Sequence, residues 1–184
     1  MVIDFRLATA HDEAPVLAMM ADFYAIDDYP FNREKAGHIF QTLVANEGLG
    51  RLWLIAEDTN VIGYVFLAFS FSFEYGGRNA FIDELYLQPP HRHKGIGKTI
   101  LAFVEKQAIA LGIQTLHLEV EHHNDAGLKL YRGRGFKDSG RYLFVKRLGE
   151  AESEVGSPQS EGKQSEKTGK TGKTEKSVKT DRLK

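Results

Sequence analysis

The order of hydrophobic and polar positions predicts strands in several stretches before residue 148. A two-residue alternation indicates a strand with one buried face. It is clearest at residues 114–121, where Leu116, Leu118 and Val120 fall on one face and His117 and Glu119 on the other. By the same criterion, together with turn signals at the ends, strands are expected at residues 2–7, 51–57, 61–73, 81–88, 114–121 and 141–147.

Apolar residues at helical spacing predict four helices between these strands. The first follows Thr9 or Asp12 and runs to about Phe23, and the others cover residues 33–46, 96–111 and 125–134. Asn32 and Asn124 are suitable N-caps for the second and the last of these helices. The resulting order, β-α-α-β-β-β-α-β-α-β, describes an α+β fold around one mixed sheet. Trp53 and the set Phe66, Phe69, Phe71 and Phe73 are expected in its core.

Composition narrows the class of protein. The chain has 184 residues, 42% of them apolar and 27% charged, which suits one globular domain with a full core. The formal net charge of −1 provides no basic field for nucleic acid. No stretch is apolar and long enough to span a bilayer, and the start of the chain lacks the pattern of a signal peptide. Cysteine is absent, which excludes disulfides and agrees with a cytoplasmic location.

Composition changes abruptly near Leu148. Residues 149–184 are rich in Gly, Ser, Thr, Lys and Glu and contain a short GKTGKT repeat. Such a segment buries too little apolar surface to offset the entropy lost on ordering. We therefore expect one domain at residues 1–148 and a disordered tail at residues 149–184.

The stretch that carries chemistry runs from Asp83 to Leu101. It passes from a strand through a turn with several cationic side chains into a helix that opens with Gly95 and Gly97. A helix N-terminus with glycines that admit close approach is suited to bind phosphate. The spacing excludes a Walker A loop, which needs Gly at the position of Arg92, and the dinucleotide fingerprint, which needs Gly at the position of Ile100.

Two separate motifs resemble those of the GNAT superfamily of N-acetyltransferases. Arg92-x-x-Gly95-x-Gly97 is similar to its acyl-coenzyme A loop. The stretch Asn124-x-x-Gly127-x-x-Leu130-Tyr131-x-x-x-Gly135-Phe136 is similar to its second signature, with Gly127 where Ala is usual. The resemblance covers about residues 2–147. It implies a three-layer fold with a mixed, mostly antiparallel sheet between helices, and acetyl-coenzyme A (acetyl-CoA) as the co-substrate.

The resemblance also assigns the residues that would bind the cofactor. Leu85, Tyr86 and Leu87 would hold the pantetheine arm through their backbone. The residues of the turn that would hold the pyrophosphate, with Asn124 as a further contact, are Arg92, His93, Lys94, Gly95, Ile96, Gly97 and Lys98. No metal site is expected, because His91 and His93 lie on an exposed turn with no evident carboxylate partner.

Acetyl transfer to an amine needs a base for the ammonium and an acid for the leaving thiolate. By resemblance, Tyr131 is the candidate acid. Glu84 is the first candidate for the base, Glu119 the second and Asp83 the third. For each of these groups, a purely structural role remains open.

The sequence leaves the acceptor amine undetermined. Asp27, Asp28 and the strand acids favour a cation, and Tyr29 could line its pocket, so Asp28, Tyr29 and Asp83 are predicted substrate contacts. A small polyamine-like or amino-acid-like amine is the first choice, and a protein or peptide amine the second. A non-catalytic acyl-CoA binding module and a homodimer both remain open, whereas nucleic acid and membrane are not expected as partners.

Overall fold

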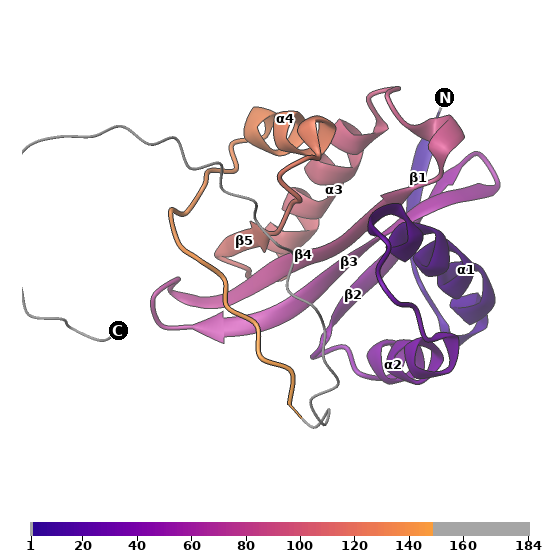
Figure 1. Cartoon of the computed structure of the whole chain (residues 1–184), viewed down its shortest axis with the longest axis horizontal. Coiled ribbons are helices and arrows are strands. Elements are labelled where there is room, and N and C mark those ends of the chain that lie inside the picture. Colours follow the sequence, from indigo (N-terminus) through magenta and orange to yellow (C-terminus); the bar gives the residue numbers. More distant parts are fainter. Residues whose placement is uncertain (1, 149–184) are drawn as a thin grey trace, which may run out of the picture. The chain divides into compact units, whose positions relative to one another are not determined.

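Five strands form one sheet in the computed structural model, which describes residues 2–148 (Figure 1). They are β1 (Ile3–Leu7), β2 (Gly50–Glu57), β3 (Asn60–Ser72), β4 (Gly77–Leu87) and β5 (Thr115–Leu118), and they lie side by side in chain order. All neighbours are antiparallel except β4 and β5, which are parallel. The sheet is therefore mixed and mostly antiparallel, as predicted.

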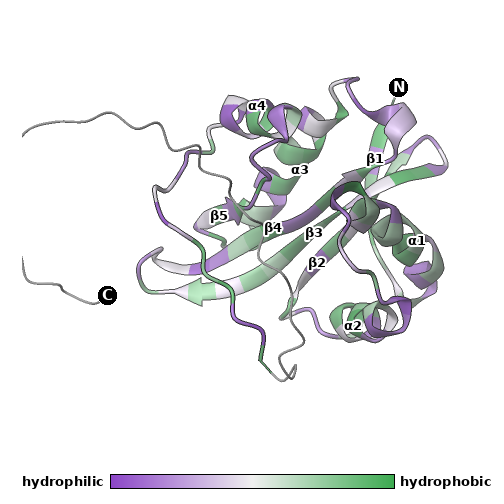
Figure 2. Ribbon diagram, viewed as in Figure 1, coloured by the Kyte–Doolittle hydropathy of each residue, from purple (hydrophilic) through white to green (hydrophobic). Residues whose placement is uncertain are grey.

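Four helices cover the two faces of this sheet (Figure 1). They are α1 (Glu13–Tyr24), α2 (Arg33–Ala45), α3 (Ile96–Ala110) and α4 (Asp125–Gly133), joined by single turns η1 (Ala10–Asp12), η2 (Ala25–Asp27) and η3 (Pro89–His91). The strand β2 shows why two layers form. Its Leu52 and Leu54 pack with residues of α1 and α2, whereas Trp53 and Ile55 pack with α3. Alternate side chains point to opposite faces of a strand, so the apolar centre of the sheet supplies two cores (Figure 2).

Local sequence signals set where the helices begin. The side chain of Asn32 accepts a hydrogen bond from the backbone N–H of Lys35 at 2.9 Å, and that of Asn124 accepts from Gly127 at 2.8 Å. Each bond satisfies a donor that has no partner within its own helix. Both predicted N-caps are thus confirmed, and the α+β fold class with them.

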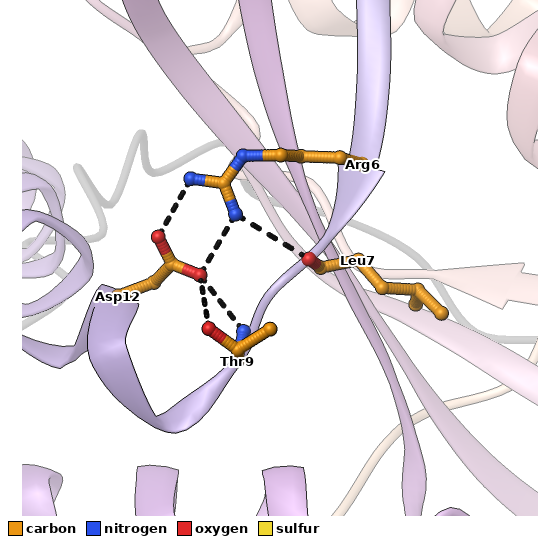
Figure 3. A network of polar contacts seen from close by, with 4 residues as sticks. All are labelled: Arg6, Leu7, Thr9 and Asp12. Carbon is orange, nitrogen blue, oxygen red and sulfur yellow. Dashed lines mark hydrogen bonds and ion pairs between the residues drawn. The ribbon is translucent and has the colours of Figure 1, made fainter.

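A polar network joins β1 to the start of α1 (Figure 3). Arg6 donates to both carboxylate oxygens of Asp12, at 2.8 and 2.6 Å. The backbone N–H and the hydroxyl of Thr9 donate to the same carboxylate, at 2.8 and 2.9 Å. The bond from Arg6, and after it those from Thr9, hold the pKa of Asp12 well below its usual range. The network fixes the turn that brings α1 onto the sheet.

Two of the predictions about single elements are wrong. Residues 141–147 carry no regular secondary structure, although their alternation predicts a strand. Alternation determines only which face a strand would bury, and the strand itself needs a hydrogen-bonded neighbour. Phe71 and Phe73 are 73% and 98% exposed rather than buried. The ladder between β2 and β3 ends at Ala68, so both rings lie on a hairpin that extends beyond the neighbouring strand.

The chain divides into two compact units, one ending at Gly140 and the other beginning at Arg141. Of the second unit, the structure describes only residues 141–148. The predicted tail, residues 149–184, lies outside the described residues, and the boundary at 148 stays a prediction. Within residues 2–148, no helix is both long and apolar enough to cross a membrane.

Asp12→Asn should lower the free energy of unfolding by about 1–3 kcal/mol at neutral pH, the range for a hydrogen-bonded charged group. A carboxylate with a lowered pKa contributes stability above the pKa of the unfolded state, about 3.9, and loses it as the pH falls further. The difference between wild type and variant should therefore shrink below about pH 4. Chemical denaturation at several pH values measures this difference. Asp4→Asn, at an exposed position of β1, is the control, and an equal loss in both variants would contradict the assignment.

Candidate active site

A β-bulge in β4 shapes the candidate site. Phe66 of β3 pairs with Glu84, and the next residue, Leu67, pairs with Ile82, so Asp83 is the extra residue. The parallel ladder between β4 and β5 ends at the same place, since Ile82 and Leu118 are its last pair. Beyond the bulge, β4 continues to Leu87 without a neighbour on that side among the described strands. Bulges bend a strand, and a cleft borders β4 beyond the point where its pairing with β5 ends.

The cleft has a volume of about 1150 Å³. One wall is the end of β4, another is the turn before α3, and the other walls are α4 and the end of α1 with η2. The predicted cofactor-binding residues that line it are Leu85, Tyr86, Leu87, Arg92, His93, Gly95, Gly97, Lys98 and Asn124. Lys94 and Ile96 do not line it. Ile96 is 2% exposed and belongs to the core under α3, so only its backbone could contact a ligand.

The turn before α3 holds the conformation that an anion site needs. Gly95 is the N-cap and has φ of 83°, a left-handed value that disfavours side chains, and His93 has φ of 62°. The first N–H groups of α3 follow directly and have no partner within the helix. Lys98, which follows Gly97 in the first turn of α3, is exposed and lines the cleft. Positive charge and free N–H groups together favour a phosphate group here.

Arg92, the first residue of the turn motif, already contacts other residues of the protein. Arg92 donates from Nε to the backbone oxygen of Leu87 at 2.8 Å, and its guanidinium lies 5.5 Å from the ring centre of Tyr86. These contacts fix the turn to the end of β4. His91 has a carboxylate neighbour that the sequence did not indicate, since its Nδ1 lies 2.9 Å from an oxygen of Glu57. In residues 2–148, however, no group of three or more His, Asp or Glu side chains is placed to hold a metal ion.

The two sequence motifs meet at Gly97. A Cβ atom added to Gly97 would lie 2.9 Å from a methyl carbon of Leu130 on α4. The absence of a side chain at position 97 therefore lets α3 and α4 pack closely. Gly127 has a similar role within α4, since a Cβ there would lie 2.9 Å from the side chain of Asn124. A side chain at position 127 would therefore crowd the side chain that forms this cap.

Tyr131, the candidate acid, lines the cleft from α4. Its ring packs against the core under α3 and lies edge-on to Phe136, with 6.0 Å between ring centres. Burial raises the pKa of its hydroxyl above the ordinary value. Among residues 2–148 the hydroxyl has no hydrogen-bond partner, so it is available to a ligand in the cleft.

Glu84 lies on the other face of β4 and is 9% exposed. Its Oε2 accepts a hydrogen bond from the hydroxyl of Tyr64 at 2.7 Å, and its Oε1 accepts one from Tyr24 at 3.1 Å. Burial raises the pKa of Glu84, and the two hydroxyl donors partly oppose that rise. Sequence reasoning missed Tyr64, because a tyrosine within an apolar strand reads as core, and it is 0% exposed.

The predicted acceptor residues do not line the cleft. Asp28 is exposed in a left-handed conformation, and Asp83 is the bulge residue of β4. Glu119, a candidate base, is exposed one residue after the end of β5 and does not line the cleft either. Tyr29 donates its hydroxyl to Glu121 at 2.7 Å. The carboxylate that does line the cleft is Asp27, whose oxygen lies 3.0 Å from Nε2 of His123.

These last contacts join two loops. The segment after α1 supplies Asp27 and Tyr29, and the segment after β5 supplies Glu121 and His123. No sequence pattern indicated these pairs, because their members lie 92 and 96 positions apart. The charge of Asp27 was noted in the sequence, but its orientation depends on the turn η2.

The mixed sheet and the cleft at a glycine-rich helix N-terminus agree with the fold that the two motifs predicted, and sequence comparison gives the family. The profile of the acetyltransferase (GNAT) family matches residues 16–136. The chain belongs to this family.

Individual relatives agree with that assignment. Thialysine N-epsilon-acetyltransferase of Bos taurus is 35% identical over 78 residues, which cover 42% of this chain and 45% of that protein. Spermidine N(1)-acetyltransferase of Thermoplasma acidophilum is 35% identical over 80 residues, covering 44% of this chain and 46% of that protein. The chain thus spans about half the length of these curated relatives.

A solved structure extends the similarity to most of the fold. An integron cassette protein from the mobile metagenome of Cole Harbour Salt Marsh is 33% identical, with a TM-score of 0.71. The match covers 80% of this chain and 91% of that one.

The contact between Gly97 and Leu130 can be tested by a double-mutant cycle. Gly97→Ala gains helix propensity but crowds Leu130, whereas in a Leu130→Ala background only the gain remains. We expect the substitution to be more favourable by about 1 kcal/mol in that background, within the usual coupling range. Chemical denaturation measures the four free energies of unfolding. Gly133→Ala, where an added Cβ meets no atom within 4 Å, is the control. Equal effects of Gly97→Ala in both backgrounds would contradict the contact.

Proposed function

We propose that the protein transfers an acetyl group from acetyl-CoA to the primary amine of a small cationic molecule. One observation carries the proposal: a single cleft connects the glycine turn at α3, the end of β4 and the hydroxyl of Tyr131. The turn suits the pyrophosphate, and the edge of β4 at Leu85–Leu87 that has no neighbouring strand among residues 2–148 suits the amides of the pantetheine arm. The thioester would then lie near Tyr131. Membership of the acetyltransferase family supports the same reading.

The reaction we infer is direct attack of the amine on the thioester. An alkylammonium has a pKa of about 10.4 and must lose a proton before it can attack. Glu84 is the base we favour, because burial raises its pKa toward the working pH, where a general base is most effective. Tyr131 protonates the leaving thiolate. Its raised pKa keeps the hydroxyl protonated at neutral pH. Glu119 and Asp83 are the alternative bases.

Charge at the mouth of the cleft supports a cationic acceptor. Asp27 lines the cleft, and Glu121 and Glu119 lie around the hydroxyl of Tyr29 beside it. A concentration of carboxylates attracts cations and raises their local concentration. The names of the two curated relatives, which refer to thialysine and spermidine, agree with an amine of this kind. Protein or peptide amines are the second candidate acceptor.

Thiol release from acetyl-CoA in the presence of a panel of amines tests the proposal. The panel contains polyamines, basic amino acids and a peptide with a free N-terminus. Turnover with a small cationic amine is expected. Thermal stabilisation by acetyl-CoA with no turnover on any amine would instead favour a non-catalytic binding module, and turnover with the peptide alone would favour the second acceptor class.

Lys98→Ala should weaken acetyl-CoA binding by about tenfold or more, the loss expected for one charge-assisted contact of about 1.5–3 kcal/mol. The wild-type affinity should also fall with added salt more steeply than that of the variant. Calorimetric titration at two ionic strengths measures both effects. Lys106→Ala removes a charge from an exposed position of the same helix and should bind as the wild type does. Equal affinities of the two variants would place the phosphate group elsewhere.

Tyr131→Phe should lower kcat by about 10²–10⁴-fold, the usual range for a positioned acid. Binding of acetyl-CoA should change little, since the ring and its packing remain. The wild-type rate should fall only above about pH 10, because the raised pKa delays loss of the hydroxyl proton. The variant should lack this alkaline fall. Full kcat with the alkaline limb retained would show that Tyr131 serves packing and that water is the acid.

A further inference from the structure

The carboxylate of Glu84 accepts hydrogen bonds from two tyrosine hydroxyls, and the two tyrosines differ in their exposure to solvent. Tyr64 donates to Oε2 at 2.7 Å and is 0% exposed, with its ring 6.1 Å from that of Tyr86. Tyr24 donates to Oε1 at 3.1 Å and is only partly buried. Glu84 itself is 9% exposed and does not line the cleft. An amine therefore cannot approach the carboxylate through Tyr64, and the accessible side is that of Tyr24.

Tyr24 lies beside the cleft, although it is not one of the residues that line it. It is the last residue of α1, and its ring packs edge-on against Phe23 and Phe31, at 6.0 and 5.5 Å between ring centres. Its neighbours in the chain, Phe23 and Ile26, line the cleft. The hydroxyl of Tyr24 thus connects the enclosed carboxylate to the segment that borders the ligand space.

We propose that Tyr24 relays the proton of the acceptor amine to Glu84. This inference rests on the proposed function and names a catalytic residue for it. In the step, the hydroxyl oxygen of Tyr24 takes a proton from the ammonium while its own proton passes to Oε1 of Glu84. The products are a neutral amine, an unchanged tyrosine and a neutral glutamic acid. Glu84 later returns the proton to solvent by the same route.

The state of Tyr24 suits a relay rather than a base. Burial, and after it the charge of Glu84, raises the pKa of Tyr24 to about 12. The hydroxyl therefore stays neutral at physiological pH, with one proton to donate and a lone pair to accept one. A neutral hydroxyl exchanges protons without holding a charge in a partly buried site, where a charge is costly.

Of the two tyrosines that donate to Glu84, Tyr64 holds the carboxylate in place. Its hydroxyl, from β3, holds the second oxygen of Glu84 and so directs the first toward Tyr24. The other titratable group whose charge acts on Glu84 is Asp83, the bulge residue of β4. Tyr64 does not meet the amine and is a positioning residue.

Tyr24→Phe and Tyr64→Phe form a matched pair, because each removes one hydroxyl bond to the same carboxylate. With a polyamine as acceptor, Tyr24→Phe should lower kcat by about 10²-fold or more, as expected for loss of a positioned proton-transfer group. Its acid limb should move toward the pKa of the free amine, about 10.4, because only amine already neutral can react. Tyr64→Phe should lower kcat less and keep a lower acid limb, since the relay remains.

A second acceptor sharpens the comparison. With an amine that is already neutral at pH 7, no proton has to be removed before the attack, and the nitrogen loses its proton only after the C–N bond has formed. Tyr24→Phe should therefore lose much less of the wild-type rate with this amine than with the polyamine. Melting temperatures and acetyl-CoA affinities of both variants show whether packing has changed. Should Tyr64→Phe fail to fold, the pH profile of Tyr24→Phe decides alone.

The relay is overturned if Tyr24→Phe keeps the wild-type kcat and acid limb, or if the loss is the same for both acceptors. Either result leaves Tyr24 as a structural donor to Glu84. The proposed function fails in a different way, through absence of turnover in the wild type with every amine. The two failures are thus distinguishable in one set of assays.

Discussion

The end of pairing between β4 and β5 is the constraint on which the site depends. Up to Ile82 the two strands share a parallel ladder, and β5 ends at Leu118, the partner of Ile82, just before the bulge at Asp83. On that side, residues Leu85–Leu87 border a cleft instead of a strand, while they stay paired with β3 on the other side. The bulge also places Glu84 on the face of α1 and α2, while Leu85 packs on the α3 side. One extra residue thus creates both the space for a ligand and the direction of the enclosed carboxylate.

The protein places polar groups in two different environments on either side of β4. On the cleft side, the turn before α3 combines backbone N–H groups with exposed cations such as Lys98, an arrangement for a ligand that carries its own charge. On the other side, Glu84 receives neutral donors only, from Tyr24 and Tyr64. Neutral hydroxyls stabilise the carboxylate without neutralising it, so its charge remains responsive to a cation that approaches. The strand between the two environments keeps them a short distance apart.

The sequence predicted features that depend on residues nearby in the chain, and it failed for features that depend on a partner far away in the chain. Asn32 and Asn124 were recognised as caps because a cap depends on residues three positions away. The strand expected at residues 141–147 was wrong, because no pattern within a segment supplies its pairing neighbour. Phe71 and Phe73 were misplaced for a similar reason, since hydrophobicity does not show where the adjacent strand ends.

The same division holds within the site. Residues of the glycine turn line the cleft, as their motif indicated, whereas the acceptor side was read less well. Asp28 was preferred to Asp27, although only the geometry of η2 decides which of two adjacent carboxylates faces the cleft. Tyr64 could not be found, because its polar role exists only through Glu84, 20 positions along the chain.

The close packing at Gly97 has a consequence for how this sequence can evolve. Any side chain gained at position 97 must be matched by a loss of volume at position 130, one residue before Tyr131. A side chain gained at position 97 should therefore be accompanied or preceded by a smaller residue at position 130, whereas a smaller residue at position 130 alone is compatible with Gly97. The absence of a side chain at Gly97 in this way couples the evolution of the turn before α3 to that of α4.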